Sequence, residues 1–255
     1  LLKFSAVLII PVFLLLAITY SLLHGRVVKN ITTLISVFVI GVILIYPLYF
    51  ITTVNYPIEK QTSDTSFILE SLGIRPIAEV DIWMTKSRIL RPYAHYLLGL
   101  LMVLQRSAGG NTTYFLGNVG ASGWWYYFPV VYLLKEQLSA LVFIIIGLLL
   151  AMLRFIDAAR KRWKIKEYIS TNFAVFGMIV FVVVYCIFSM RSPLNIGVRH
   201  VLPTIPFIYI LAAGSIKKWI HGDRKLLKIA FVAILVPIYF INTLMTAPYF
   251  LSFFN

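Results

Sequence analysis

Charged side chains stand in or beside apolar runs at two places, where ions are costly and usually serve a function. Lys135 and Glu136 lie inside an apolar run, and Arg199 and His200 lie in the short stretch Asn195–Pro203 between two such runs. A Lys ammonium binds phosphate as a point charge, an Arg guanidinium binds it through paired hydrogen bonds, and a His can bind it or transfer a proton. These residues therefore predict a phosphate site at a membrane surface.

Arg91 and His95 lie one helical turn apart and are a further candidate for this site. Structural alternatives stay open, because Lys135 can extend back to the membrane interface and Arg199 can pair with lipid headgroups. The four histidines are too scattered to argue a metal site, and the single cysteine, Cys186, excludes an internal disulfide. We expect no metal and no cofactor.

Aromatic residues gather immediately before the apolar run that contains Lys135, in the sequence GWWYYFPVVYLLKEQL of residues 123–138. Trp and Tyr favour the boundary between membrane and water, so an interfacial belt explains them. A wall that stacks on a sugar ring or shields the first isoprene units of a lipid is the alternative. Glycines between residues 109 and 123 permit close backbone approach and suit a loop folded over a ligand. The candidate wall residues are Trp124, Trp125, Tyr126 and Tyr127.

Membrane helices must position these residues. The chain has 255 residues, of which 60% are hydrophobic and 13% are charged, whereas a soluble domain is about half apolar and about a quarter charged. We predict an all-α, polytopic bundle of about six spanning helices, because a span needs about 20 mostly apolar residues. The segments that qualify or come close are about 4–23, 31–51, 128–153, 171–190, 201–216 and 229–246.

Basic residues concentrate in three short loops, 24–30, 154–168 and 217–228, which alternate correctly if all three face the cytoplasm. Membrane topology therefore accounts for the net charge of +14, and we expect a lipid bilayer and no nucleic acid as partner. The sequence reads as a multi-pass integral protein of a prokaryotic cell membrane. It forms a single membrane domain over residues 1–255, with residues 52–127 as one large external loop.

The external loop is long enough to contain structure of its own. We expect short helices over Ser66–Ile74 and Val80–Leu90, separated by Gly73 and Pro76. The apolar run Tyr93–Leu104 is too short to span comfortably. An interfacial or re-entrant helix is the preferred interpretation, and a seventh span is the alternative.

Several blocks of the sequence resemble those of the protein O-mannosyltransferase-like superfamily, whose members are membrane glycosyltransferases of the GT-C fold. Their order and spacing agree with that family over roughly residues 85–255. The matching blocks are Arg91–Gly99, Tyr114–Gly117, Gly123–Pro129 with Lys135, Asn195–Pro203 with Pro206, and Pro248–Asn255. The chain departs from the family at Asn118, where bacterial members often carry Glu, and at Glu136-Gln137-Leu138, where Thr-Pro-Leu is usual.

The resemblance implies transfer of a sugar from a polyprenyl-phosphate carrier to an acceptor hydroxyl on the external face. It implies that Lys135, Arg199 and His200, with Arg91 behind them, bind the lipid phosphate. The family's catalytic acidic residue lies in its first external loop, which would precede Leu1, so the chain is expected to be the C-terminal part of the enzyme. The acceptor can be a protein, a lipid or a polysaccharide.

Two other functions remain open at this point. A transporter or flippase of a lipid-linked substrate would also use large loops and interfacial cations, although the predicted spans carry almost no ionisable residues that could form an ion path. A non-catalytic membrane scaffold is the third possibility.

Overall fold

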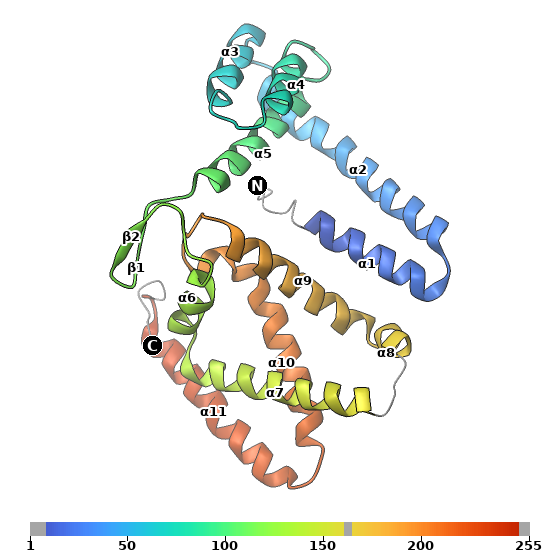
Figure 1. Cartoon of the computed structure of the whole chain (residues 1–255), viewed down its shortest axis with the longest axis vertical. Coiled ribbons are helices and arrows are strands. Elements are labelled where there is room, and N and C mark those ends of the chain that lie inside the picture. The colour runs from blue at the N-terminus through green and yellow to red at the C-terminus, as the bar shows by residue number, and fades with distance from the viewer. Residues whose placement is uncertain (1–8, 161–164, 250–255) are drawn as a thin grey trace. The chain divides into compact units, whose positions relative to one another are not determined.

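A computed structural model describes residues 9–160 and 165–249 and shows a chain that is almost entirely α-helical (Figure 1). The predicted all-α fold is confirmed. Contacts divide the chain into two compact units. The first unit reaches to Thr112 and includes Gly120–Ser122, and the second contains Thr113–Val119 and the residues from Gly123 onward. Each unit is described by itself.

The first unit opens with a pair of apolar helices, α1 (Ile9–His24) and α2 (Val27–Thr53), joined by a tight turn at Gly25. Most of their side chains are exposed and few are buried, which fits helices that face lipid. Asn30 donates a hydrogen bond to the Ser21 hydroxyl at 3.1 Å and ties the two helices near the turn. The beginning of the predicted span 4–23 lies outside the described residues.

Three further helices follow in this unit, and a proline stands at or just before the start of each: α3 (Ile58–Ile68), α4 (Arg75–Thr85) and α5 (Arg91–Gly109). Proline is favoured there because its fixed φ suits the first turn and its missing N–H has no helical partner to lose. Residues 52–127 contain short helices as expected, but the predicted ranges Ser66–Ile74 and Val80–Leu90 were wrong, because Leu69–Ile74 connect α3 to α4 and α4 ends at Thr85. Pro76 begins α4 instead of separating two helices.

Leucines from α5 and from the segment after α3 form the core of these three helices. The buried members are Leu69, Leu72, Ala78, Leu98 and Leu101. α5 extends beyond the predicted run Tyr93–Leu104, since Gln105–Gly109 continue the helix. Its mixed polarity distinguishes it from the helices that could cross a membrane.

The second unit contains a small hairpin of β1 (Thr113–Phe115) and β2 (Asn118–Gly120), followed by the remaining helices. These are α6 (Tyr127–Lys135), α7 (Leu138–Arg160), α8 (Ile165–Thr171), α9 (Phe173–Arg191), α10 (Ile205–Ile220) and α11 (Lys225–Thr246), with the 3₁₀ turns η2 (Val198–His200) and η3 (Leu202–Thr204) before α10. The predicted span 128–153 is not continuous, because the helix breaks at Glu136 and Gln137. The predicted loop 154–168 is largely helical, and its residues 161–164 lie outside the described part.

Helices α7 and α10 pack with their backbones in close contact (Figure 1). A Cβ placed on Gly147 would lie 2.7 Å from the Cα of Ala212, so only glycine fits at this crossing. Small residues at helix contacts permit such approach in membrane proteins. Arg154 adds a hydrogen bond to the carbonyl of Ser215 at 3.2 Å.

Four helices in the described residues are long and apolar enough to cross a membrane. They are α2, the Leu138–Asp157 part of α7, α9 and α11; α1 is apolar but shorter. Few of their side chains are buried within the protein, and none in the most apolar stretches of α2 and α11. A lipid bilayer is the environment that accommodates these surfaces, as the composition predicts.

The core of the first unit also contains an acidic side chain, Asp81 of α4. Its side chain is fully buried, and neither carboxylate oxygen has a hydrogen-bond partner in the described residues. Burial raises the pKa of this carboxyl from 3.8 to about 7, because the charged form is poorly solvated there. The helix therefore tolerates a protonated Asp81 better than an ionised one.

We expect the stability of the first unit to fall as the pH rises from about 4 to about 7. The unfolded chain releases the Asp81 proton near pH 4, whereas the folded chain holds it until about pH 7, so the stability present at low pH is lost across this window. The full loss amounts to about 4 kcal/mol at most. Asp81→Asn should flatten this dependence and raise the melting temperature at pH 8, measured by thermal unfolding in detergent.

Asp64→Asn is the matched control, because the Asp64 carboxylate accepts a hydrogen bond from the Tyr56 hydroxyl. This variant should not gain stability at pH 8. An equal rise in both variants, or an unchanged pH dependence in Asp81→Asn, would contradict the assignment.

Candidate functional site

Two blocks that lie about 70 residues apart in the sequence come together in the second unit. The first turn of α6 packs against η2, where the ring of Phe128 stacks on His200 with centroids 5.2 Å apart and planes 28° apart. Tyr185 of α9 donates a hydrogen bond to the backbone carbonyl of His200 at 2.9 Å. The aromatic residues 124–128, hereafter the aromatic block, thus form one structural site with the Arg199-His200 block, and His200 is held between α6 and α9.

Arg199 points outward from this contact, and its side chain is exposed. Its charge acts on the neighbouring Tyr127 phenol, which is itself buried. Burial raises the pKa of Tyr127, while a backbone hydrogen bond with Gly197 and the Arg199 charge act in the opposite direction. The Arg199 guanidinium is therefore close to the aromatic block and open to a ligand from solution or the membrane surface.

The four predicted wall residues do not share one orientation. Tyr127 is buried with Phe128, and Trp124 and Tyr126 pack partly buried against the same cluster, which includes Phe115 of β1. Trp125 is 68% exposed. The hairpin and the aromatic block are therefore mainly core, and Trp125 is the member that presents its ring outward.

Gly123 fixes how closely the aromatic block approaches the second block. Its φ is +71°, and a Cβ there would lie 2.9 Å from the Cα of Pro193 and 3.0 Å from its carbonyl oxygen. Asn195 lies beside this contact, and its backbone carbonyl accepts a hydrogen bond from Thr113 at 2.9 Å. The glycine before the two tryptophans is thus required by a backbone contact.

We expect Gly123→Ala to destabilise the second unit more than Gly117→Ala does. Both glycines have positive φ, so both substitutions share the backbone strain, but nothing lies within 4 Å of a Cβ at Gly117. The steric clash should add about 1–3 kcal/mol at Gly123. Thermal unfolding of the two variants side by side measures the difference, and equal losses would rule out the close contact.

The break between α6 and α7 is held by hydrogen bonds to two other helices. Tyr209 of α10 donates to the Glu136 carboxylate at 2.6 Å, and the Gln137 amide donates to the Thr243 hydroxyl of α11 at 2.9 Å. Glu136 and Gln137 thus form polar links from the break to α10 and α11. The Glu136 carboxylate thereby receives a hydrogen bond from within the protein.

Lys135 is the last residue of α6 and is half-buried. It lies seven residues beyond Phe128, which corresponds to about 10 Å along the helix axis. A side chain in a helix leans toward the N-terminus, so the Lys135 stem is directed back along α6. The helix therefore separates Lys135 from the Phe128–His200 contact by about two turns.

We expect Tyr209→Phe to destabilise the second unit by about 1.5–3 kcal/mol, because it removes a hydrogen bond to a carboxylate that stays partly buried. Tyr114→Phe is the control, since that side chain is 70% exposed. Thermal unfolding in detergent checks both. Similar melting temperatures for wild type and Tyr209→Phe would show that the link contributes little.

Arg91, the fourth predicted phosphate ligand, belongs to the first unit. Its guanidinium donates to the side-chain oxygen of Gln61 at 3.0 Å and to the carbonyl of Tyr56, while the Gln61 amide donates to the carbonyl of Arg91 at 3.2 Å. These bonds fasten α5 to α3. Burial, with the nearby Arg91 charge, lowers the pKa of His95, which favours the neutral ring.

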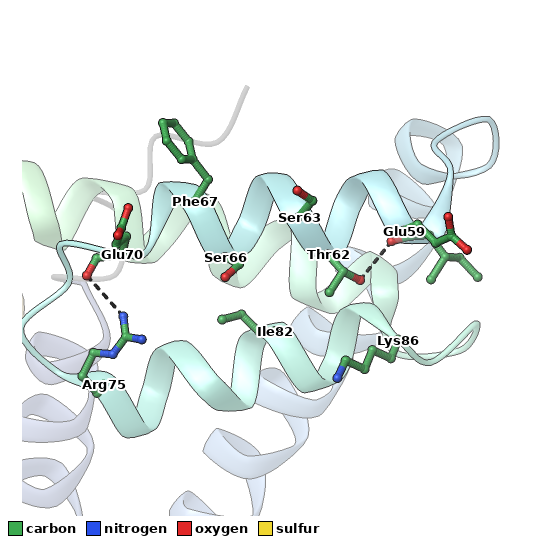
Figure 2. Close-up of a pocket in the computed structure, with 10 residues that line it drawn as sticks. Glu59, Thr62, Ser63, Ser66, Phe67, Glu70, Arg75, Ile82 and Lys86 are labelled. Atoms are coloured by element: carbon green, nitrogen blue, oxygen red, sulfur yellow. Dashed lines mark hydrogen bonds between the residues drawn. The ribbon is translucent and has the colours of Figure 1, made fainter.

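A polar groove, hereafter the α3–α4 groove, lies between α3 and α4 (Figure 2). It was not predicted from the sequence. Its volume of about 830 Å³ lies in the range of ligand sites, roughly 300–1,000 Å³. Hydroxyls of Thr62, Ser63 and Ser66 line it together with residues of both charges. The signal in the sequence is the polar run 59–66, which interrupts an apolar chain and carries hydroxyls one turn apart.

Metal chemistry receives no support from the part of the chain that the structure describes, because no three metal-ligating side chains meet there. Comparison with protein-family models, with curated proteins and with solved structures finds no match to this sequence.

Proposed function

We propose that the chain belongs to a membrane glycosyltransferase that transfers a sugar from a polyprenyl-phosphate carrier to an acceptor hydroxyl on the external face. One observation carries this proposal. The exposed Arg199 of η2 lies beside Tyr127 at the N-terminal end of α6, and α6 ends at Lys135. Two cations at a membrane boundary, next to an outward-facing Trp125, suit an anionic lipid headgroup that carries a sugar.

In the proposed reaction the acceptor oxygen attacks the anomeric carbon of the sugar. A new C–O bond forms to the acceptor, and the bond from the anomeric carbon to the phosphate oxygen breaks. Polyprenyl phosphate leaves with the electron pair, and a carboxylate base takes the acceptor proton. This chain supplies the groups that stabilise the leaving phosphate.

Each cation has its own part in this scheme. Arg199 binds the phosphate through paired hydrogen bonds, and Lys135 adds a point charge farther along α6. His200 is held by Phe128 and Tyr185, so it positions Arg199 and offers its ring to the phosphate. Arg91 belongs to the first unit, where its bond to Gln61 fastens α5 to α3, so its loss would also disturb the fold.

The proposed orientation follows from the same scheme. The loops 24–30, 154–168 and 217–228 face the cytoplasm of a prokaryotic cell, and residues 52–127 and 191–200 face outward. The lipid phosphate would then lie at the external surface, where Arg199 stands outside the basic loops.

We expect Arg199→Ala to weaken binding of polyprenyl phosphate by about 10–100-fold, because a charge-assisted phosphate contact contributes about that much. Lys135→Ala should act in the same direction. Native mass spectrometry of the chain in nanodiscs, titrated with polyprenyl phosphate and with uncharged polyprenol, measures the effect. Polyprenol should bind equally to all variants.

Arg191→Ala is the matched control, because Arg191 is an exposed Arg at the end of α9 in the same external region. It should bind polyprenyl phosphate like the wild type. Equal affinities for Arg199→Ala and Arg191→Ala would overturn the phosphate assignment. In the whole enzyme, normal sugar transfer by both Arg199→Ala and Lys135→Ala would do the same.

A further inference from the structure

The α3–α4 groove is built as a rigid cleft, since a hydrogen bond braces each of its ends. At one end the Thr62 and Thr85 hydroxyls are 2.8 Å apart. At the other end Arg75 donates to the carbonyls of Leu69 and Glu70, at 3.4 and 3.2 Å. The lining therefore keeps its shape before a ligand arrives, which reduces the entropy lost on binding.

Each end of the groove also carries one acid and one base. Glu59 and Lys86 flank the Thr62–Thr85 bond, and Glu70 and Arg75 stand at the opposite end (Figure 2). All four side chains are exposed and line the cleft. Between them, Figure 2 shows Thr62 and Ser66 directed toward α4 and Ile82 directed toward α3. Donors and acceptors thus alternate along the whole cleft, with a small apolar surface between them.

The charges select among ligand classes. Two carboxylates and two cations leave the lining with no net formal charge, which disfavours nucleic acids and other polyanions. Strand addition needs a free strand edge and helix-in-groove binding needs an apolar groove, whereas α3 and α4 present mainly hydroxyls and charges here. A neutral polyhydroxylated ligand fits, because each of its hydroxyls both donates and accepts and its C–H faces can pack on Ile82 and Phe67.

We propose that the α3–α4 groove binds a neutral saccharide and holds it as the sugar acceptor, a role that rests on the proposed glycosyltransferase function. The carboxylates of Glu59 and Glu70 accept hydrogen bonds from saccharide hydroxyls, and Arg75 and Lys86 donate to saccharide oxygens. The hydroxyls of Thr62 and Ser66 fill the positions between them. The acceptor is then a glycan chain, and the groove volume of about 830 Å³ has room for more than one sugar ring.

The test is a binding titration of the whole chain in nanodiscs with three neutral trisaccharides: mannotriose, cellotriose and N-acetylated chitotriose. A serine-rich hexapeptide serves as the competing ligand class. We expect saturable binding of at least one trisaccharide and a loss of about tenfold or more in Glu70→Gln and in Lys86→Ala. Calorimetry or ligand-observed NMR measures the affinities.

Two variants on the same helices serve as controls. Glu79→Gln of α4 and Lys60→Ala of α3 make the same changes at exposed positions outside the groove lining and should bind like the wild type. Failure of all three trisaccharides to bind, binding of the peptide alone, or equal losses in groove and control variants would overturn the proposal. Arg199→Ala should leave saccharide binding intact, so failure here is separable from failure at the lipid phosphate.

Discussion

A carboxylate within a bundle of apolar helices requires a hydrogen-bond donor, and in the second unit Tyr209 supplies it to Glu136. This bond determines two features of the second unit. It stabilises the break that separates α6 from α7, and it fastens the end of α6 to α10. The Phe128–His200 stack fastens the beginning of α6 to the turn that precedes α10. The short helix is therefore fixed at both ends to one neighbouring segment, and Lys135 and Arg199 take their places from it.

The fold class follows from the sequence because apolar length and composition decide it, and α2, α9 and α11 lie close to their predicted ranges. The predicted span 128–153 was wrong in one respect. A run of apolar residues predicts a helix, but whether Glu136 and Gln137 interrupt it depends on partners from α10 and α11 more than 70 residues away. Similarly, the sequence indicates that Trp124 to Tyr127 lie at an interface but cannot show that Phe115 and Val201 bury most of them.

The candidate site, too, was predictable from the sequence only in part. Arg199 and Lys135 stand out because charges in apolar surroundings are visible in any sequence. The roles of His200 and Arg91 are less visible, since both side chains also make structural contacts that arise from tertiary packing. The α3–α4 groove is the reverse case: Ser63, Ser66 and Lys86 are ordinary surface residues in the sequence, and only the pairing of two helices brings them to one cleft.

The contact between Gly147 and Ala212 has a consequence for how lipids reach the second unit. Because the backbones of α7 and α10 touch there, no hydrocarbon tail can pass between these two helices at that point. The prenyl chain of the proposed carrier must therefore reach Lys135 by a route that avoids this crossing. At this crossing, α7 and α10 leave no space for a lipid chain.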